Sequence, residues 1–175
     1  GETHPNDNVG VKALYIAPLK ALINDQYVRL KDLSIHTDLN LHRWHGDVPG
    51  TEKKKVRETP SGILQITPES LESCFINYGS RASAMFINLE YVVIDELHAF
   101  QGDVRGVHLA SLLSRIVQLC NKRPRFIGLS ATLANFVSAQ SYLNRLKPNT
   151  VKIIQDDNGG RTLKLGIRAY AKPNP

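Results

Sequence analysis

The sequence has little of what secreted and membrane proteins depend on. Its 175 residues include two cysteines, and no apolar run approaches the length of a bilayer-spanning helix. The first residues, 1–8, are polar and do not resemble a signal peptide. Because oxidised secreted domains usually carry more cysteines, we predict a cytoplasmic protein without a membrane partner, in which Cys74 and Cys120 are buried thiols.

Side chains that bind metals or act as nucleophiles are also scarce. His42 and His45 have no cysteine or carboxylate partners at the spacing of a zinc site, so we predict no zinc. Cys74 has no general base near it in the sequence, which favours a place in the core. Trp44, the single tryptophan, could stack on a nucleobase or lie half-buried at a strand end, and the sequence leaves both open.

The charge of the chain is moderately basic. Lys and Arg number 22 against 16 Asp and Glu, which gives a formal net charge of +6. Since cationic side chains release counterions from phosphates, this balance favours a nucleic-acid partner. A basic surface that only keeps the protein soluble would be the better explanation if charge were the only clue. The densest basic run, Lys53-Lys54-Lys55 with Arg57, favours a solvated helix face over a direct contact with DNA or RNA.

Short apolar segments alternate with longer amphipathic ones, which predicts an α/β fold with a largely parallel sheet flanked by helices. The expected strands are residues 11–16, 39–44, 63–66, 89–94, 125–129, 151–154 and 163–167. The expected helices are residues 19–33, 51–58, 106–120, 136–146 and a helix that begins at Pro68 with Thr67 as its cap. Residues 89–94 are the most hydrophobic, so we expect them at the centre of the sheet.

Four of these strands end in polar clusters. The clusters are Ala17-Pro18-Leu19-Lys20, Thr67-Pro68-Glu69-Ser70, Asp95-Glu96-Leu97-His98 and Ser130-Ala131-Thr132. Ligands of open α/β sheets bind at the carboxyl ends of the strands, so we expect the clusters to share one face. A carboxylate at the tip of a buried strand can organise the water shell of a Mg²⁺ that bridges ATP phosphates, and a second can orient the attacking water. Alternatively, Asp95 and Glu96 only cap the following helix.

In this order, the clusters resemble the motifs of superfamily 2 DExH helicases. The cluster at Asp95 resembles motif II and that at Ser130 resembles motif III, whereas the segments from Ala17 and Thr67 resemble motifs Ia and Ib. The residues at positions 15–22, 46–47, 95–100 and 105–106 are most similar to the motifs of the large helicase-related family. The resemblance covers residues 11–146. It implies a RecA-like P-loop NTPase fold, with residues 1–175 as a partial first lobe and 156–175 as the start of a linker to a second lobe.

The resemblance also implies roles for individual residues. Glu96 would be the catalytic base for ATP hydrolysis, and Asp95 would hold Mg²⁺. The residues that couple the nucleotide to the nucleic acid would be His98, Ser130 and Thr132. Single-stranded DNA or RNA would run along Pro18, Lys20, Ala21, Gly46, Asp47, Thr67, Pro68 and Glu69. The Lys20 ammonium and the amides at helix starts suit phosphates, which fix position without reading sequence.

One motif of the family has no counterpart in this sequence. The phosphate-binding loop ending in Gly-Lys-Thr or Gly-Lys-Ser does not occur in the 175 residues. The resemblance places that loop before motif Ia, so we expect it upstream of Gly1, and the second lobe with its arginine finger beyond Pro175. We therefore expect a fragment of an ATP-dependent helicase that binds ATP poorly and hydrolyses it negligibly by itself.

Two other hypotheses remain open. The chain could be a non-catalytic nucleic-acid-binding module that has lost its phosphate loop, and upstream coding sequence would distinguish this module from a motor. An unrelated α/β enzyme with accidental matches is the remaining alternative. It predicts that the four polar clusters do not converge on one face.

Overall fold

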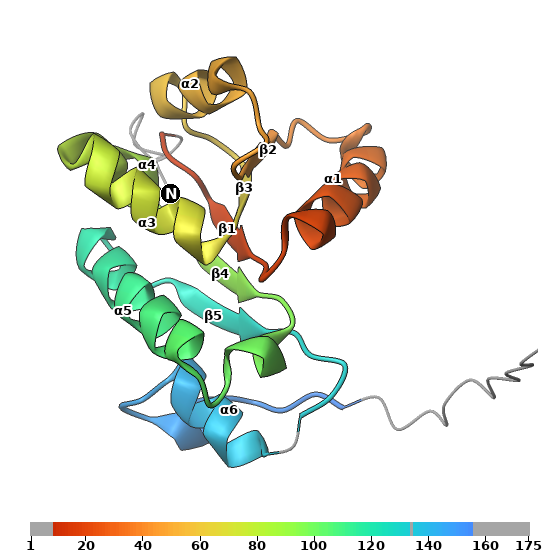
Figure 1. Cartoon of the computed structure of the whole chain (residues 1–175), viewed down its shortest axis with the longest axis vertical. Helices are drawn as coiled ribbons and strands as arrows, with labels where there is room; N and C mark the ends of the chain where they lie inside the picture. The colour runs from red at the N-terminus through yellow and green to blue at the C-terminus, as the bar shows by residue number, and fades with distance from the viewer. Residues whose placement is uncertain (1–8, 134, 156–175) are drawn as a thin grey trace, which may run out of the picture.

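The sheet contains five parallel strands in the order β2-β3-β1-β4-β5. The computed structural model describes residues 9–133 and 135–155. The strands have four residues each: β1 Ala13–Ile16, β2 Leu41–Trp44, β3 Ile63–Ile66, β4 Tyr91–Ile94 and β5 Arg125–Gly128. Because every neighbouring pair is parallel, all five carboxyl ends lie along the same edge of the sheet. In Figure 1 the arrows of β1, β4 and β5 point the same way.

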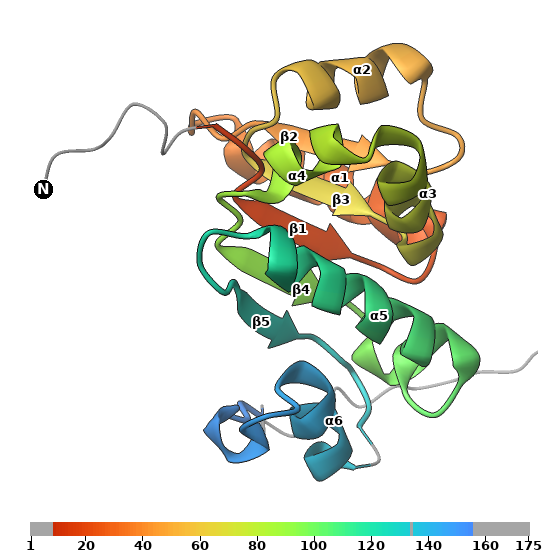
Figure 2. The ribbon, with the colours of Figure 1, turned by 90° about the vertical axis from the view of Figure 1, so that its left-hand side faces the viewer.

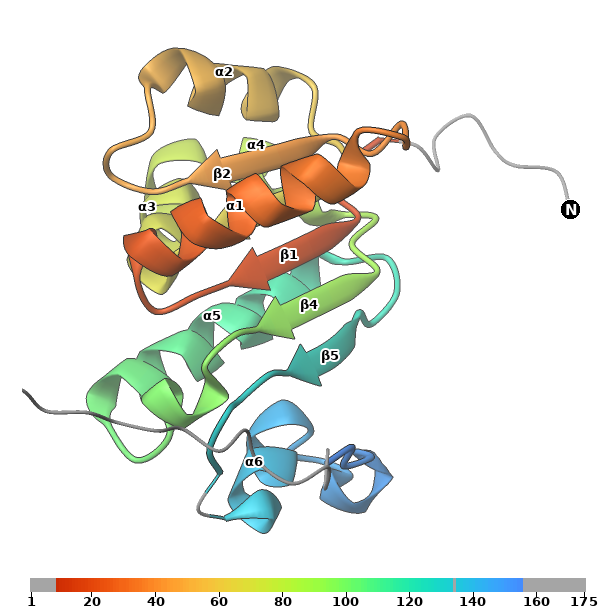
Figure 3. The same cartoon turned by 90° about the vertical axis from the view of Figure 1, so that its right-hand side faces the viewer.

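Helices cover both faces of the sheet. Figure 2 shows α3, α4 and α5 side by side on one face, and Figure 3 shows α1 on the other. The helices are α1 Lys20–Ser34, α2 Gly50–Glu58, α3 Pro68–Tyr78, α4 Ser80–Phe86, α5 Val104–Leu119 and α6 Phe136–Leu143, with short 3₁₀ turns η1 Leu97–Phe100 and η2 Pro148–Thr150. None of the helices in the described ranges is long and apolar enough to cross a membrane.

The middle strand of the described sheet is β1, so the prediction that residues 89–94 form its centre is wrong. Leu14 and Ile16 of β1 are fully buried against the helices of one face, and Tyr15 is buried under α1 on the other. In β4, by contrast, Tyr91 is 40% exposed. Hydrophobicity ranks how deeply a strand is buried, but the order of strands follows from the crossovers between them, which local composition does not encode.

The predicted cap at the start of α3 is confirmed, whereas that of α5 was not predicted. Thr67 Oγ1 accepts a hydrogen bond from the Ser70 amide at 3.3 Å, which caps α3 as expected. Asp103 caps α5 in the same way, because its Oδ1 accepts from the Gly106 amide at 2.9 Å. This cap places the start of α5 two residues before the predicted start.

The prediction of a strand over residues 151–154 is wrong. The chain leaves η2 at Thr150 and continues to residue 155 without pairing to the sheet. Ile153 is 49% and Ile154 is 96% exposed, so these apolar side chains do not join the core. The predicted strand over residues 163–167 and the proposed linker at 156–175 lie outside the described residues.

The two cysteines differ in burial. Cys74 is fully buried in the core as predicted, whereas Cys120 is only partly buried at the end of α5. Burial raises the pKa of each thiol to about 11, so both are protonated at neutral pH. This state agrees with the prediction that Cys74 is a packing residue and not a nucleophile.

Candidate functional site

The acidic pair stands where β4 ends. The Asp95 amide continues the sheet by donating to Ile16 O at 2.8 Å, and the chain then turns into η1. Asp95 Oδ1 accepts from the Glu96 amide at 2.9 Å, and Asp95 Oδ2 accepts a short hydrogen bond from the Tyr15 hydroxyl. Desolvation and the bond to Asp95 raise the pKa of Tyr15, which keeps this hydroxyl a donor. Both oxygens of the Asp95 carboxylate are therefore held in place.

Glu96 has an unusual backbone conformation. Its φ angle is +48°, and it is the one non-glycine residue with positive φ in the part of the chain that the structure describes. Such a conformation costs about 1–3 kcal/mol, and residues strained in this way cluster at functional sites. The Glu96 side chain is two-thirds buried, and its Oε2 lies 3.3 Å from His98 Nδ1. A strained turn thus holds a carboxylate next to Asp95.

A contact between two polar side chains joins the ends of β4 and β5. His98 Nδ1 lies 2.9 Å from Ser130 Oγ, and that hydroxyl donates to Thr132 O at 2.8 Å. The backbone supports the contact, since the Leu97 amide donates to Leu129 O at 2.8 Å. The structure therefore brings together His98, Ser130 and the Thr132 backbone, whereas the Thr132 side chain is exposed.

A cavity of about 670 Å³ opens beside this contact. Asp95, Glu96 and Ser130 line it, together with side chains of α6 and of residues 151–155. No group of three or more ligating side chains occurs among the described residues. Nucleotide-bound Mg²⁺ keeps several waters and takes one or two carboxylates plus the phosphates, so an acidic pair at the wall of a cavity fits such an ion.

The other predicted residues lie at the ends of β1, β2 and β3. Lys20 Nζ bonds Asp47 Oδ1 at 2.9 Å, which ties the start of α1 to the loop after β2. The bond from Lys20 holds the pKa of Asp47 below its usual range. A Cβ on residue 46 would lie 3.2 Å from Lys20 Nζ. Because Gly46 has no Cβ, it leaves room for the contact of Lys20 with Asp47.

Asn24 on α1 fixes the end of β2. Its Oδ1 accepts from Arg43 Nη1 at 3.0 Å and lies 3.1 Å from His45 Nε2. His45 is buried, and this desolvation is the main cause of its lowered pKa. Neither Asn24 nor His45 was predicted to matter, because their contact spans 21 residues and only the packing of α1 against β2 creates it.

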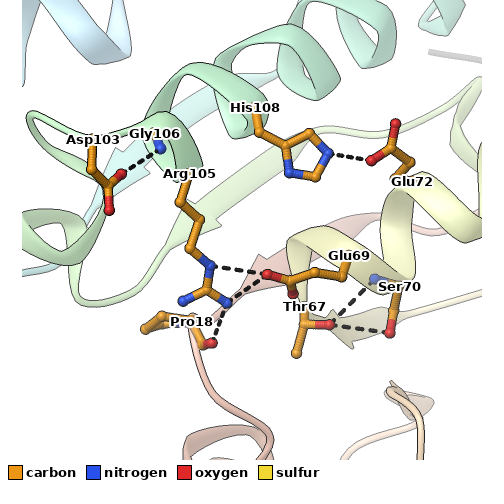
Figure 4. Close-up of polar contacts among 9 residues, drawn as sticks. All are labelled: Pro18, Thr67, Glu69, Ser70, Glu72, Asp103, Arg105, Gly106 and His108. Atoms are coloured by element: carbon orange, nitrogen blue, oxygen red, sulfur yellow. Dashed lines mark hydrogen bonds and ion pairs between the residues drawn. The ribbon is translucent and has the colours of Figure 1, made fainter.

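The remaining predicted residues divide by exposure. Pro18, Thr67 and Pro68 are buried, so they shape the turns, whereas Ala21 and Glu69 are exposed. Arg105 of α5 contacts both Pro18 and Glu69 and thereby joins the ends of β1 and β3 (Figure 4). All four polar clusters therefore lie along one edge of the sheet, which contradicts the alternative of accidental matches.

The sequence matches the family model of DEAD/DEAH box helicases over residues 3–139. This chain belongs to the DEAD/DEAH box helicase family. The predicted family and the predicted RecA-like fold with a parallel sheet are confirmed.

Curated helicases and a solved helicase structure show the same likeness. The chain is 34% identical to the uncharacterized ATP-dependent helicase YprA of Bacillus subtilis, a match of 93% of this chain and 22% of that protein. It is 36% identical to the Lhr helicase/uracil glycosylase of Escherichia coli, over 80% of this chain and 10% of that protein. The structure of Mycobacterium smegmatis helicase Lhr bound to ssDNA and AMP-PNP aligns with a TM-score of 0.69 and 28% identity, and covers 77% of this chain and 19% of that one. The chain thus spans about a fifth or less of these relatives.

In this DEAD/DEAH box helicase chain, Trp44 is not a stacking platform. Its side chain is 4% exposed and packs edge-on against Tyr78, with ring centroids 5.8 Å apart. Trp44 therefore lies at the strand end, as the second interpretation predicted, but it is almost fully buried and not half-buried. Tyr15 and Arg105 belong to the segments that carry the family resemblance, but the sequence predicted no role for either. Their side-chain contacts reach residues 80 and at least 36 positions away, so the fold alone creates them.

Proposed function

We propose that this chain is part of the first RecA-like lobe of an ATP-driven helicase motor that moves along single-stranded nucleic acid. The observation that carries the proposal is the contact of His98 with Ser130, at 2.9 Å, beside the acidic pair and the 670 Å³ cavity. Two neighbouring strand ends are joined there by a side chain that can exchange partners. A motor needs such a link between its nucleotide and its nucleic acid.

In this proposal, Asp95, Glu96, His98, Ser130 and Thr132 form the nucleotide end of the lobe. Glu96 accepts the proton of the attacking water, and Asp95, held by Tyr15 and its own loop, holds the magnesium ion. When bound, Mg²⁺ neutralises charge that develops on the ATP phosphates. His98 and Ser130 transmit the state of the nucleotide along the edge of the sheet.

The nucleic-acid end comprises Pro18, Lys20, Ala21, Gly46, Asp47, Thr67, Pro68 and Glu69. Lys20 and the first turn of α3 offer a cation and helix amides, which bind phosphates without regard to base sequence. The relative from Mycobacterium smegmatis was solved with single-stranded DNA, which supports a single strand as the ligand of this end. A linker at residues 156–175, a second lobe and a reducing cytoplasm complete the proposal, and the two free thiols support the last of these.

The test is ATP turnover by the full-length protein with and without single-stranded DNA or RNA. We expect turnover that requires Mg²⁺ and rises when a single strand is added. A protein that binds the strand but never hydrolyses ATP would overturn the motor and favour the non-catalytic module. Comparing DNA and RNA strands of one sequence in the same assay identifies the preferred substrate.

A further inference from the structure

Arg105 joins three segments that are far apart in the sequence. Its Nε and Nη2 lie 2.9 Å and 2.8 Å from Glu69 Oε1 on the first turn of α3. The same Nη2 donates to the Pro18 carbonyl at 2.5 Å, where β1 turns into α1. The guanidinium also lies over the ring of Phe100, 5.6 Å from its centroid, in the turn that follows the acidic pair. Figure 4 shows the first two contacts converging on one side chain.

The base of Arg105 is rigid, so these contacts fix the segments relative to one another. Arg105 lies in the first turn of α5, which Asp103 caps through the Gly106 amide at 2.9 Å. Next to it, a Cβ on Gly106 would lie 1.8 Å from Phe100 O, so α5 starts in direct contact with the turn after β4. A planar guanidinium on such a base sets both the distance and the direction of its partners, which a lysine ammonium cannot do.

We propose that Arg105 is a positioning residue for single-strand binding, a role that rests on the function proposed above. It holds the turn that carries Lys20 and the first turn of α3 in one arrangement, so that their donors meet consecutive phosphates. We assign it no phosphate contact, because Glu69 matches its charge and its Nε and Nη2 are already bonded within the chain.

The chain provides a matched control in the same pair of helices. His108 and Glu72 lie three residues after Arg105 and Glu69, with His108 Nε2 2.5 Å from Glu72 Oε2 (Figure 4). Both pairs join α3 to α5, but the second lies a turn further from the strand ends and contacts neither Pro18 nor Phe100 in the described structure. A general role in helix packing would affect both pairs alike.

The experiment measures the affinity of the full-length protein for a fluorescein-labelled oligodeoxythymidine strand over a range of salt concentrations. We expect Arg105→Gln to weaken binding on the order of tenfold, because charge-assisted hydrogen bonds that fix two segments are lost. The variant His108→Gln retains binding close to that of the wild type. The double variant Arg105→Gln with Glu69→Gln has the wild-type net charge and still binds about tenfold more weakly, with the salt dependence of the wild type.

Four results would overturn the positioning role. Wild-type affinity of the double variant would mean that Arg105 only masks the charge of Glu69. An equal loss in His108→Gln would mean that the whole interface of α3 and α5 matters, and not its first pair. If Arg105→Gln binds like the wild type, the positioning role of Arg105 is wrong but the proposed function stands. If the wild-type protein binds no single strand, both the positioning role and the proposed function are wrong.

Discussion

The two ends of the proposed site share one edge of the sheet but differ in how their charges are matched. At the nucleotide end, Asp95 and Glu96 line a cavity and have no cationic partner other than a histidine within the described residues. At the nucleic-acid end, Lys20 is paired with Asp47 and Glu69 with Arg105. The nucleotide end thus leaves its carboxylates open to a cation from outside the chain, whereas at the nucleic-acid end Lys20 must exchange Asp47 for a phosphate.

The two ends are joined within the sheet itself. Tyr15 lies on β1, three residues before Pro18, and its hydroxyl holds Asp95 at the end of β4. His98 and Ser130 continue the connection from β4 to β5. In the proposed motor, this short chain of hydrogen bonds is the route between the two ends, so the ends can be tested separately and together.

The largest effect is expected at the nucleotide end. Removing the charge of the proposed base in Glu96→Gln should lower ATP turnover by about 10²–10⁴-fold, while the binding of a fluorescent ATP analogue persists. Glu90→Gln is the control, because Glu90 directly precedes the first residue of β4, at the end opposite to Glu96, and pairs with Lys12. Steady-state hydrolysis by the full-length protein measures the difference. Turnover that survives in Glu96→Gln would assign the base to another residue.

A smaller effect is expected from the residue that orients Asp95. Tyr15→Phe removes one hydrogen bond to the carboxylate and leaves the ring in place. Mutation of a residue that orients a metal ligand typically lowers metal affinity by about 10–100-fold. The Mg²⁺ concentration for half-maximal turnover should therefore rise by about tenfold. Tyr91→Phe, on the exposed start of β4, should leave that concentration unchanged. An unaltered Mg²⁺ requirement in Tyr15→Phe would show that Tyr15 does not orient Asp95 and does not connect the two ends.

Variants of the two partners of the ion pair at the nucleic-acid end should change single-strand affinity in opposite directions. Lys20→Ala should weaken single-strand binding and lower its salt slope by about one, since one phosphate contact is lost. Asp47→Asn frees Lys20 from its internal partner and should strengthen binding, by up to about fivefold, because an exposed ion pair is weak and opens easily. Fluorescence anisotropy measures both. Weaker binding in Asp47→Asn would show that Asp47 positions Lys20 and does not compete for it.

The difference between the two ends also explains how far the sequence could predict them. The strand-end clusters were predictable because hydrophobic periodicity locates strands, and parallel strands must end at one edge. The contacts of Tyr15 with Asp95 and of Arg105 with Pro18 span 80 and 87 residues, so they depend on strand order and helix packing, which no local pattern encodes. For the same reason, the apolar residues 151–154 were predicted as a strand although they have no sheet partner in the described structure.

The linkage between the two ends can be measured without hydrolysis. The affinity of the full-length protein for a labelled single strand is determined with and without a non-hydrolysable ATP analogue, for the wild type and for Ser130→Ala. If His98 and Ser130 couple the ends, the analogue changes wild-type affinity by at least about fivefold, and Ser130→Ala loses most of that change. Equal affinity of the wild type with and without the analogue would contradict a coupled motor.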